Sequence, residues 1–383
     1  MRKFFCVALA ALTGCLPVFS ACAHTSLLAK DEYNIFGSQV RWVYSSSEQP
    51  EALWAALSES ARAIESSISV SAEGSAVSRF NRAAAGETVD VGETAYRILQ
   101  TARNVYEETD GAYDPAVGLL VDLWGFSPRH RLATYTPTLP YDRADFEQEL
   151  PEEKYCVAFS QPAVSDFGTA ELSLTQTTLT KPSAVAAVEG DDTQYTMQLS
   201  LDGIGKGACV DAAAEILSAA DVEYGYFNVG GSSLLVLENP DDDGGLWEIS
   251  VSSPREEPGD SYATLLVRDT TVSTSGDYEQ YYEIEGTRYC HIIGKDGKPV
   301  GAGSHVVCAT VVGGLAAEGD ARATALVTMS ADEACAYASA HADEFRVMFV
   351  WFDSETEEYT LYTNLDAENY RVTAAFDHVE VFA

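Results

Sequence analysis

Two oxygen-bearing side chains in the C-terminal part of the chain have the spacing of a metal-binding pair. Asp320 and Thr324 are four residues apart in a stretch whose apolar pattern predicts a helix that opens at Asp320 and runs through Leu326. Residues at i and i+4 of a helix share one face, so the carboxylate and the hydroxyl would point the same way. Oxygen ligands suit a hard cation such as Mg²⁺, although a helix cap beside a satisfied threonine explains the pair equally well.

A glycine-rich segment, Leu199–Gly207, supplies a second chemical signal. It predicts a strand, a turn at Gly203 and Gly205, and a helix in whose start Lys206 lies. Free backbone N–H groups at a helix start, with a lysine beside them, favour the binding of a phosphate group. The glycine spacing is not that of a Walker A motif, no serine or threonine follows Lys206, and the Rossmann dinucleotide fingerprint does not fit. The segment therefore predicts phosphate binding outside these two classes of protein.

The segment Asp110–Phe126 mixes small, acidic and aromatic residues in an order that neither helical nor strand periodicity requires. Asp114 stands between a tyrosine and a proline, Gly118 follows, and Trp124 belongs to a Trp-Gly-Phe corner. Such a sequence is suited to placing backbone and rings around a flat ligand, and a loop that leads into a buried strand is the structural alternative.

One histidine is a candidate for proton transfer. His291 lies in the predicted strand Tyr289–Ile293, and an imidazole titrates near neutral pH without any special environment. A single histidine on a strand is more often structural than catalytic. His291 is therefore a candidate only in combination with the phosphate and metal signals.

Regular elements flank these segments and must position them. Alternating polarity predicts a strand at Gln39–Tyr44, and apolar residues at helical spacing predict helices at Glu51–Ser69 and about Glu93–Glu108. The second half of the chain is rich in predicted strands, which are Trp247–Val251, Ala263–Arg268, Val306–Val312 and Phe345–Trp351. The segment from about 127 to 195 is irregular and richer in Pro, Thr, Asp and Glu, so we interpret it as a variable insertion or a set of edge strands within one domain.

The charge of the chain limits its partners. The 383 residues include 59 acidic and 23 basic side chains, which gives a formal net charge of −36. This charge repels nucleic acid and anionic lipid, so no nucleic-acid partner is expected. Phosphate binding would have to be local, through a lysine, backbone N–H groups or a divalent cation.

Residues 1–22 have the pattern of an export signal. Arg2 and Lys3 precede a short apolar run, Phe4–Leu12, that is too brief for a permanent membrane span. Cys15 ends a lipobox-like Leu-Thr-Gly-Cys sequence, and Cys22 is a weaker second candidate for lipid modification. We favour a lipoprotein held by a lipid anchor on the outer face of a bacterial cell membrane, with release of a soluble secreted protein as the alternative.

In their order along the chain, these segments resemble the ApbE family of FAD:protein FMN transferases. The similarity extends from about residue 33 to 372, nearly the whole chain after the signal. The matching segments are Ser78–Asn81, Ala112–Pro115 with Leu123–Phe126, Gly203–Gly207, Asn228–Gly231, Thr274–Tyr278, His291–Ile293, and Asp320 with Thr324.

The resemblance implies both a fold and an activity. The fold would be a single α+β domain of two interleaved lobes, with mostly antiparallel sheets flanked by helices and FAD in the cleft between the lobes. The activity would be Mg²⁺-dependent cleavage of the FAD pyrophosphate, with attachment of FMN through a phosphoester bond to a Thr or Ser of an exported target protein and release of AMP. In such phosphoryl transfer, positioning and a divalent cation do most of the catalysis.

The same resemblance assigns roles to individual residues. Asp320 and Thr324 would hold Mg²⁺ together with the backbone carbonyl of Gly203. His291 would handle the proton, either by activating the acceptor hydroxyl or by protonating the departing AMP phosphate. The residues that would contact FAD are Phe36, Ala112, Tyr113, Asp114, Lys206 and Ile293.

The chain departs from the family pattern at several positions. Ser200 replaces an aspartate that is common before the glycine turn, Ala323 replaces an acidic residue of some relatives, and the loop after Ile293 is one residue shorter. Two alternatives to the transferase therefore stay open. One is hydrolysis of FAD to FMN and AMP, with water in place of the acceptor hydroxyl, and the other is a flavin-binding lipoprotein without catalysis.

Overall fold

The computed structural model describes residues 27–45, 49–127, 150–173, 176–255 and 260–383. The predicted export signal, with Cys15 and Cys22, lies outside the described residues, as does part of the predicted insertion, 128–149. Of the helices that are described, none has the length and hydropathy needed to cross a membrane.

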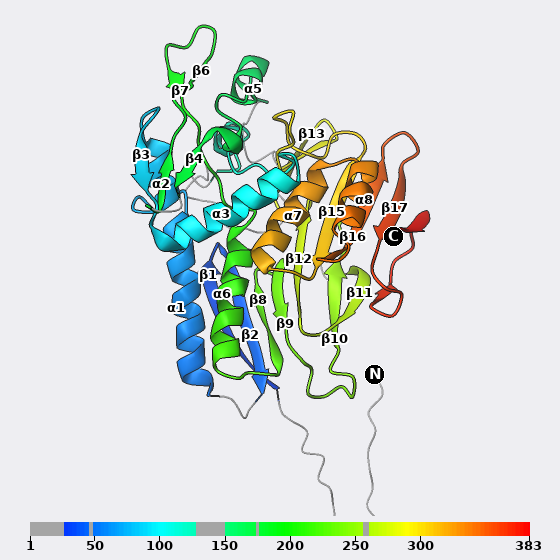
Figure 1. Cartoon of the computed structure of the whole chain (residues 1–383). Helices are drawn as coiled ribbons and strands as arrows, with labels where there is room; N and C mark the ends of the chain where they lie inside the picture. The colour runs from blue at the N-terminus through cyan, green and yellow to red at the C-terminus, as the bar shows by residue number, and fades with distance from the viewer. Residues whose placement is uncertain (1–26, 46–48, 128–149, 174–175, 256–259) are drawn as a thin grey trace, which may run out of the picture.

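A nine-stranded sheet forms the centre of the molecule (Figure 1). Neighbouring strands run antiparallel, except for the last pair, which is parallel. In sheet order the strands are β1 (Leu27–Ile35), β2 (Ser38–Ser45), β8 (Gly225–Val229), β9 (Ser233–Val236), β12 (Thr270–Gly276), β15 (His305–Val312), β16 (Arg346–Asp353), β17 (Glu358–Thr363) and β19 (His378–Val381). The predicted strands at Gln39–Tyr44, Val306–Val312 and Phe345–Trp351 are confirmed, each to within about two residues.

Helices cover one face of this sheet. In Figure 1, α1, α6 and α7 lie in front of the strands, and α3 crosses their upper ends. Their apolar faces, with Leu57, Leu99 and Leu217 fully buried, pack against sheet residues such as Phe227. The helices on this side are α1 (Pro50–Ile68), α3 (Gly92–Glu108), α6 (Gly205–Ala219), α7 (Ala316–Thr328) and α8 (Ala331–Ala340). Burial of one apolar face is the reason that helical spacing predicts α1 and α3 correctly.

A small sheet packs on the opposite face. It consists of β10 (Trp247–Ser252), β11 (Ser261–Val267) and β18 (Tyr370–Val372), and it confirms the predicted strands at 247–251 and 263–268. Tyr262 and Leu265 are buried there against the central sheet. The described chain is therefore a mixed α+β fold with mostly antiparallel sheets flanked by helices, as predicted.

A separate apolar core lies beyond one end of the central sheet. Stacked aromatic rings dominate it: the ring centroids of Phe126 and Tyr282 are 5.4 Å apart, and those of Trp124 and Tyr289 are 5.8 Å apart. Its main elements are α4 (Gly118–Leu123), α5 (Glu153–Phe159) and the hairpin β13 (Tyr281–Ile284) with β14 (Thr287–Cys290). The remaining short elements are α2 (Ala76–Arg82), β3 (Thr88–Asp90), a 3₁₀ turn at Phe167–Thr169, β4 (Glu171–Ser173), β5 (Thr178–Thr180), β6 (Ala186–Ala187) and β7 (Gln194–Tyr195).

Three predictions of local structure are wrong. The segment that ends at Leu201 forms no strand, because the Asn81 side chain binds both backbone groups of Leu199, accepting from its N–H at 2.8 Å and donating to its carbonyl at 2.9 Å. The predicted strand through His291 ends at Cys290. The helix of Asp320 begins at Ala316, so Asp320 lies in its second turn and does not cap it.

Helices α6 and α7 approach each other closely, and this contact sets the position of the candidate site. A Cβ atom on Gly207 would lie 2.2 Å from the backbone oxygen of Ala316. The Asp211 carboxylate of α6 accepts hydrogen bonds from the N–H groups of Ala316 and Ala317, at 2.7 and 2.9 Å. The start of α7 is thereby fixed against the first turns of α6.

We expect Gly207→Ala to destabilise the fold. The added methyl group must push the backbones of α6 and α7 apart, which should lower the free energy of unfolding by about 2 to 3 kcal/mol in spite of the better helix propensity of alanine. Chemical denaturation would measure this loss. Gly74→Ala is the matched control, because nothing lies within 4 Å of the added Cβ, and a change within about 0.5 kcal/mol is expected. If the two variants have the same free energy of unfolding, the close contact between Gly207 of α6 and Ala316 of α7 is contradicted.

Candidate active site

The predicted metal pair lies on one buried face of α7. The Asp320 side chain is 2% exposed, and one of its oxygens accepts a hydrogen bond of 3.0 Å from the Gly207 N–H. Thr324 Oγ1 lies 3.1 Å from the Asp320 backbone oxygen and 3.1 Å from the Ser275 hydroxyl of β12. Within the described residues, the Asp320 carboxylate meets no other hydrogen-bond donor and no cationic partner. Its second oxygen can therefore serve a ligand.

Gly203 and Tyr113 lie directly beside this pair. A Cβ atom on Gly203 would be 3.0 Å from Thr324 Oγ1 and 3.4 Å from the Tyr113 ring. Tyr113 is buried, and its hydroxyl has no hydrogen-bond partner among the residues that the structure describes. Burial raises the pKa of Tyr113 well above its ordinary value, and the nearby carboxylates of Asp320, Asp114 and Asp202 raise it further. A buried hydroxyl without a partner, next to a buried carboxylate, marks a polar site that is incomplete without a ligand.

The start of α6 carries the predicted phosphate-binding lysine. The aliphatic part of Lys206 passes Gly230, where an added Cβ would lie 3.2 Å from Lys206 Cδ. Desolvation raises the pKa of Glu279 above its ordinary value, and the nearby Lys206 ammonium offsets part of this rise. The Phe36 ring covers the same helix start, because a Cβ on Gly205 would lie 2.7 Å from it. Lys206 and Phe36 therefore both lie at the positive end of the α6 dipole, where an anion is favoured.

The loop from Ala112 to Asp114 is tied to α7 and to the 3₁₀ turn at Phe167–Thr169. The Ala112 carbonyl accepts a hydrogen bond of 3.0 Å from the Thr328 hydroxyl. The Asp114 carboxylate accepts from the N–H groups of Ala116, at 2.7 Å, and of Phe167, at 3.3 Å. Burial raises the pKa of Asp114 to about 6, although these two N–H groups lower it. The Asp114 carboxylate thus braces the loop.

His291 and Ile293 lie at the separate aromatic core beyond the end of the central sheet. Its elements, α4, α5 and the β13–β14 hairpin, are called the outer lobe below. The imidazole lies edge-on to Phe126, with the ring centroids 6.5 Å apart. His291 Nδ1 is 3.3 Å from the Gln280 carbonyl oxygen, and the His291 backbone N–H donates to the same oxygen at 2.9 Å. Ile293 is buried in the same core and pairs with Pro299 across the shortened loop.

The structure places eight of the ten predicted site residues in three groups, and Ala112 and Asp114 lie in the loop that holds Tyr113. Sequence reasoning missed some of the partners of these residues. Gly203, Asp320, Thr324 and Tyr113 form the first group, Phe36 and Lys206 the second, and His291 and Ile293 the third. The missed partners are Ser275, Asp202 and Glu279. A signal for Ser275 existed in the hydroxyl-rich Thr274–Tyr278 segment. Ser200 donates to the Asp202 carboxylate at 3.0 Å, so it supports a carboxylate two residues further on.

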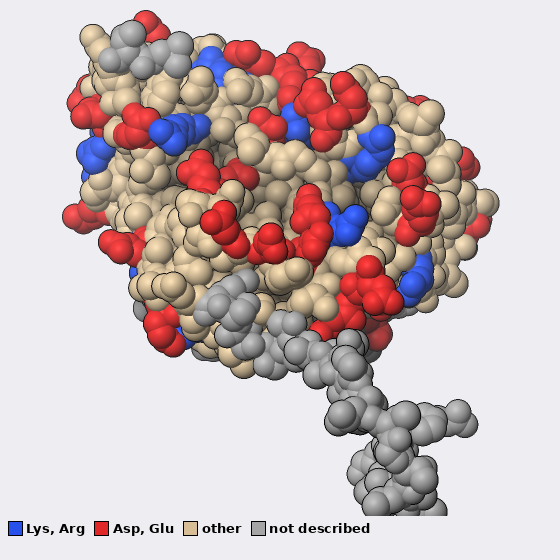
Figure 2. Space-filling view, turned by 60° about the horizontal axis from the view of Figure 1, so that its bottom comes forward, with Lys and Arg blue, Asp and Glu red and all other residues tan. Residues whose placement is uncertain are grey.

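On the face shown in Figure 2, acidic side chains are more abundant than basic ones, in agreement with the net charge of −36. Over the described residues, no group of three or more His, Cys, Asp or Glu side chains has the arrangement of a metal site.

Comparison with known proteins identifies the family. The model of the ApbE family matches residues 36–349. The chain belongs to the ApbE family. A protein named FAD:protein FMN transferase from Vibrio cholerae is 29% identical over 286 residues, which cover 74% of this chain and 75% of that protein. One of the same name from Escherichia coli K12 is 26% identical over 261 residues, 68% of this chain and 66% of the other.

The fold of this ApbE-family chain is also shared with solved structures. The crystal structure of the ApbE protein from Thermotoga maritima superposes with a TM-score of 0.68 at 23% identity, over 87% of this chain and 96% of that one. At this level of identity the likeness establishes the fold. The recognition of the family from seven ordered sequence motifs is therefore confirmed.

We expect Asp114→Asn to change the pH dependence of stability. The folded-state pKa of Asp114, about 6 against an ordinary 3.8, means that the carboxyl keeps its proton longer in the folded chain than in the unfolded chain. Its contribution to stability is therefore complete below pH 4 and is lost as the pH rises toward 6. The asparagine side chain of the variant keeps an oxygen that accepts hydrogen bonds, but it does not ionise and so does not lose stability as the pH rises. The stability of the variant relative to the parent should rise by about 1 to 2 kcal/mol across this window.

Thermal or urea unfolding at intervals between pH 4 and 7 would measure this difference. Asp110→Asn is the matched control, because the Asp110 side chain is fully exposed to solvent and the residue has a positive φ that asparagine also adopts. If the difference in free energy of unfolding between variant and parent does not change with pH for either variant, the Asp114 carboxyl is as well solvated in the folded chain as in the unfolded chain.

Proposed function

We propose that this chain is an FAD:protein FMN transferase, which cleaves the pyrophosphate of FAD, attaches FMN to a Thr or Ser of an exported target protein and releases AMP. The observation that carries the proposal is the group formed by Asp320, Thr324, Gly203 and the unpartnered Tyr113 hydroxyl beside the start of α6. A pyrophosphate needs local positive charge in so acidic a protein, and this is where the chain offers a helix start, a lysine and oxygen ligands for a cation. The relatives named above carry the same activity in their names.

The donor set fits Mg²⁺. Asp320 offers a buried carboxylate oxygen, Thr324 a hydroxyl oxygen, and Gly203 a backbone carbonyl, and hard cations prefer such oxygen ligands. When bound, the cation would neutralise charge on the pyrophosphate during transfer. Its presence would also compensate the Asp320 charge, which has no cationic partner among the described side chains.

His291 is oriented to act as a base. A carbonyl oxygen can only accept, so we propose that Nδ1 carries the ring proton and donates it to the Gln280 carbonyl, which would leave the lone pair on Nε2. In the proposed reaction, the acceptor hydroxyl oxygen forms a bond to the FMN phosphorus while His291 takes its proton. The bond from that phosphorus to the bridging oxygen breaks, and AMP leaves with this oxygen. This tautomer favours the activation of the acceptor over protonation of the leaving group.

FAD would lie between the α6 start and the outer lobe. Lys206 and the α6 N-terminus are proposed to contact its phosphates, because both supply positive charge there. Phe36, Tyr113 and Ile293 are proposed to contact its rings, with Ala112 and Asp114 shaping the loop that holds Tyr113.

We expect Asp320→Asn to abolish transfer without unfolding the protein. The amide keeps an acceptor for the Gly207 N–H but removes the charged ligand, and the loss of several kcal/mol of transition-state stabilisation would lower the rate by about a hundredfold or more. The protein without residues 1–22 would be incubated with FAD, Mg²⁺ and a peptide-tagged acceptor domain. Acceptor mass and released nucleotide would then be measured, with Asp110→Asn as the control.

Each outcome separates the candidate functions. An acceptor heavier by one FMN, AMP in solution and the loss of both in Asp320→Asn alone would establish the transferase. AMP with free FMN and an unmodified acceptor would favour the hydrolase instead. Bound FAD with neither product would leave a flavin-binding protein without catalysis.

We also propose that residues 1–22 direct export and that the mature protein is anchored by a lipid on the outer face of the membrane. The support is the charged start, the short apolar run and the lipobox-like sequence at Cys15. Cells that express the full chain would be fed an alkyne fatty acid, and labelling of the protein would be measured. We expect Cys15→Ser to lose the label and Cys22→Ser to keep it. Labelling of neither the parent nor the variants would contradict the anchor.

A further inference from the structure

A buried charge cluster lies next to the hairpin that carries His291. Asp277 directly follows β12 and is fully buried. Arg255 donates two hydrogen bonds to its carboxylate, at 2.8 and 2.6 Å, and His305 Nε2 lies 2.9 Å from one of its oxygens. Burial alone would raise the pKa of Asp277, but Arg255 and His305 lower it to about 2. The carboxylate is therefore charged at any working pH and binds partners from separate parts of the chain.

The fourth member of the cluster connects it to the hairpin. Arg288 of β14 forms an ion pair with Asp277, with Nη1 3.5 Å from Oδ1. Its guanidinium also lies over the Tyr281 ring, at 3.9 Å from the centroid, and bonds Glu283, its partner across the hairpin, at 3.2 Å. Arg288 thus holds both strands of the β13–β14 hairpin and links them to the end of the central sheet.

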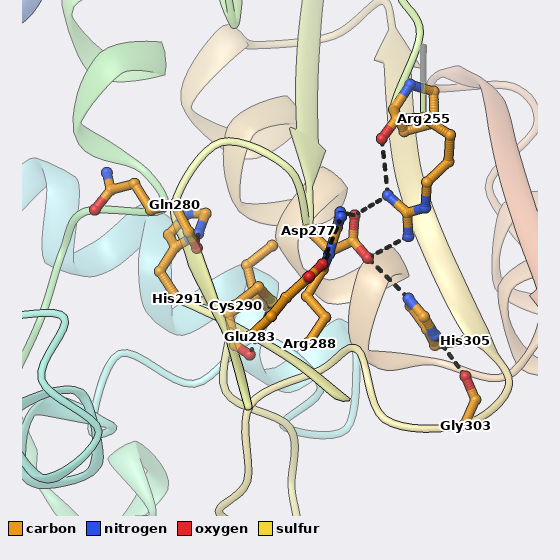
Figure 3. Close-up of polar contacts among 11 residues, drawn as sticks. Arg255, Asp277, Gln280, Glu283, Arg288, Cys290, His291, Gly303 and His305 are labelled. Atoms are coloured by element: carbon orange, nitrogen blue, oxygen red, sulfur yellow. Dashed lines mark hydrogen bonds and ion pairs between the residues drawn. The ribbon is translucent and has the colours of Figure 1, made fainter. Parts of the chain in front are cut away.

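The two residues that flank this hairpin, Gln280 before β13 and His291 after β14, contact each other. Gln280 lies three residues after Asp277, and His291 lies three residues after Arg288. The Gln280 carbonyl receives the His291 backbone N–H at 2.9 Å and faces Nδ1 at 3.3 Å. Figure 3 shows His291 and Gln280 together on one side of Asp277, with Arg255 and His305 on the other. Arg288 lies near the turn of the hairpin, opposite Glu283, and its long side chain reaches back to Asp277, which precedes the first strand of the hairpin. The Asp277–Arg288 ion pair therefore ties the second strand to the segment that enters the hairpin beside Gln280.

We infer that Asp277, acting through Arg288, is a positioning residue that keeps the Gln280 carbonyl against His291 Nδ1 and so directs the Nε2 lone pair toward the acceptor hydroxyl. This inference rests on the proposed function, in which His291 takes the proton. The side-chain partners of Asp277 in the described part of the chain are Arg255, Arg288 and His305. The effect of Asp277 is on the hairpin, because a buried anion bound by two arginines and a histidine resists any shift of the segments that supply them.

The test compares His291 in the parent and in variants of this ion pair. Asp277→Asn and Arg288→Gln remove the attraction, and long-range ¹H–¹⁵N spectra of histidine-labelled protein report which ring nitrogen carries the proton. The His291 signal is assigned by its loss in His291→Gln. We expect the parent to show the Nδ1–H tautomer and both variants to shift toward a tautomer mixture. We also expect kcat to fall about tenfold or more, with KM for FAD within about twofold, since small misplacements of a catalytic group are costly.

Two control variants separate positioning from loss of structure. Glu283→Gln removes the negative charge that pairs with Arg288 within the hairpin but keeps the Asp277–Arg288 pair, so the spectrum and kcat should match the parent. Arg288→Lys keeps the positive charge. Relative to Arg288→Gln, it should recover part of the Nδ1–H tautomer population of His291 and part of kcat. If Asp277→Asn does not fold, as judged by circular dichroism, Arg288→Gln decides the question, because the Arg288 side chain is 18% exposed whereas that of Asp277 is fully buried.

Other results would overturn the inference. An unchanged His291 spectrum in Arg288→Gln, or a changed spectrum with parental kcat, shows that the ion pair does not position the imidazole for the reaction. If the parent protein forms neither AMP nor modified acceptor, the proposed function fails, and the spectra still decide whether the ion pair sets the tautomer of His291.

Discussion

The close contact between α6 and α7 is the constraint on which the rest of the site depends. It exists because Gly207 has no side chain where the Ala316 carbonyl passes, and because Asp211 binds the first N–H groups of α7. The Gly207 N–H in turn reaches the Asp320 carboxylate. One glycine therefore allows the approach of the helices and also supplies the hydrogen bond that orients the charged ligand. The proposed phosphate-binding and metal-binding parts of the site therefore cannot shift independently.

A strongly acidic protein that binds a dinucleotide must solve an electrostatic problem locally. The net charge of −36 repels any polyanion at long range. The positive end of the α6 dipole, the Lys206 ammonium and a cation held by Asp320 would act within a few ångströms, where a general surface potential is least important. This arrangement separates the composition of the surface, which governs solubility, from the chemistry of the site.

The outer lobe provides the other half of the arrangement through its own aromatic core. Phe126 stacks on Tyr282 and lies edge-on to His291, so the hairpin and the Trp-Gly-Phe corner form one packed unit. Asp114 braces the adjoining loop through backbone N–H groups, and Asp277 ties the hairpin to the central sheet. Both carboxylates support the site from outside it, and a substrate contact for Asp114 stays a prediction.

The sequence by itself determined the long helices α1 and α3, three of the nine strands of the central sheet, two strands of the small sheet, and the polar site candidates from Lys206 to Thr324. Apolar periodicity and local glycine chemistry encode these features in neighbouring residues. Only the tertiary structure decided that Asn81 replaces a strand at Leu199, and that Asp277 joins Arg255, Arg288 and His305. Such contacts connect residues far apart in the chain, and their partners are selected by packing and by the need to satisfy buried polar groups, which no local pattern records.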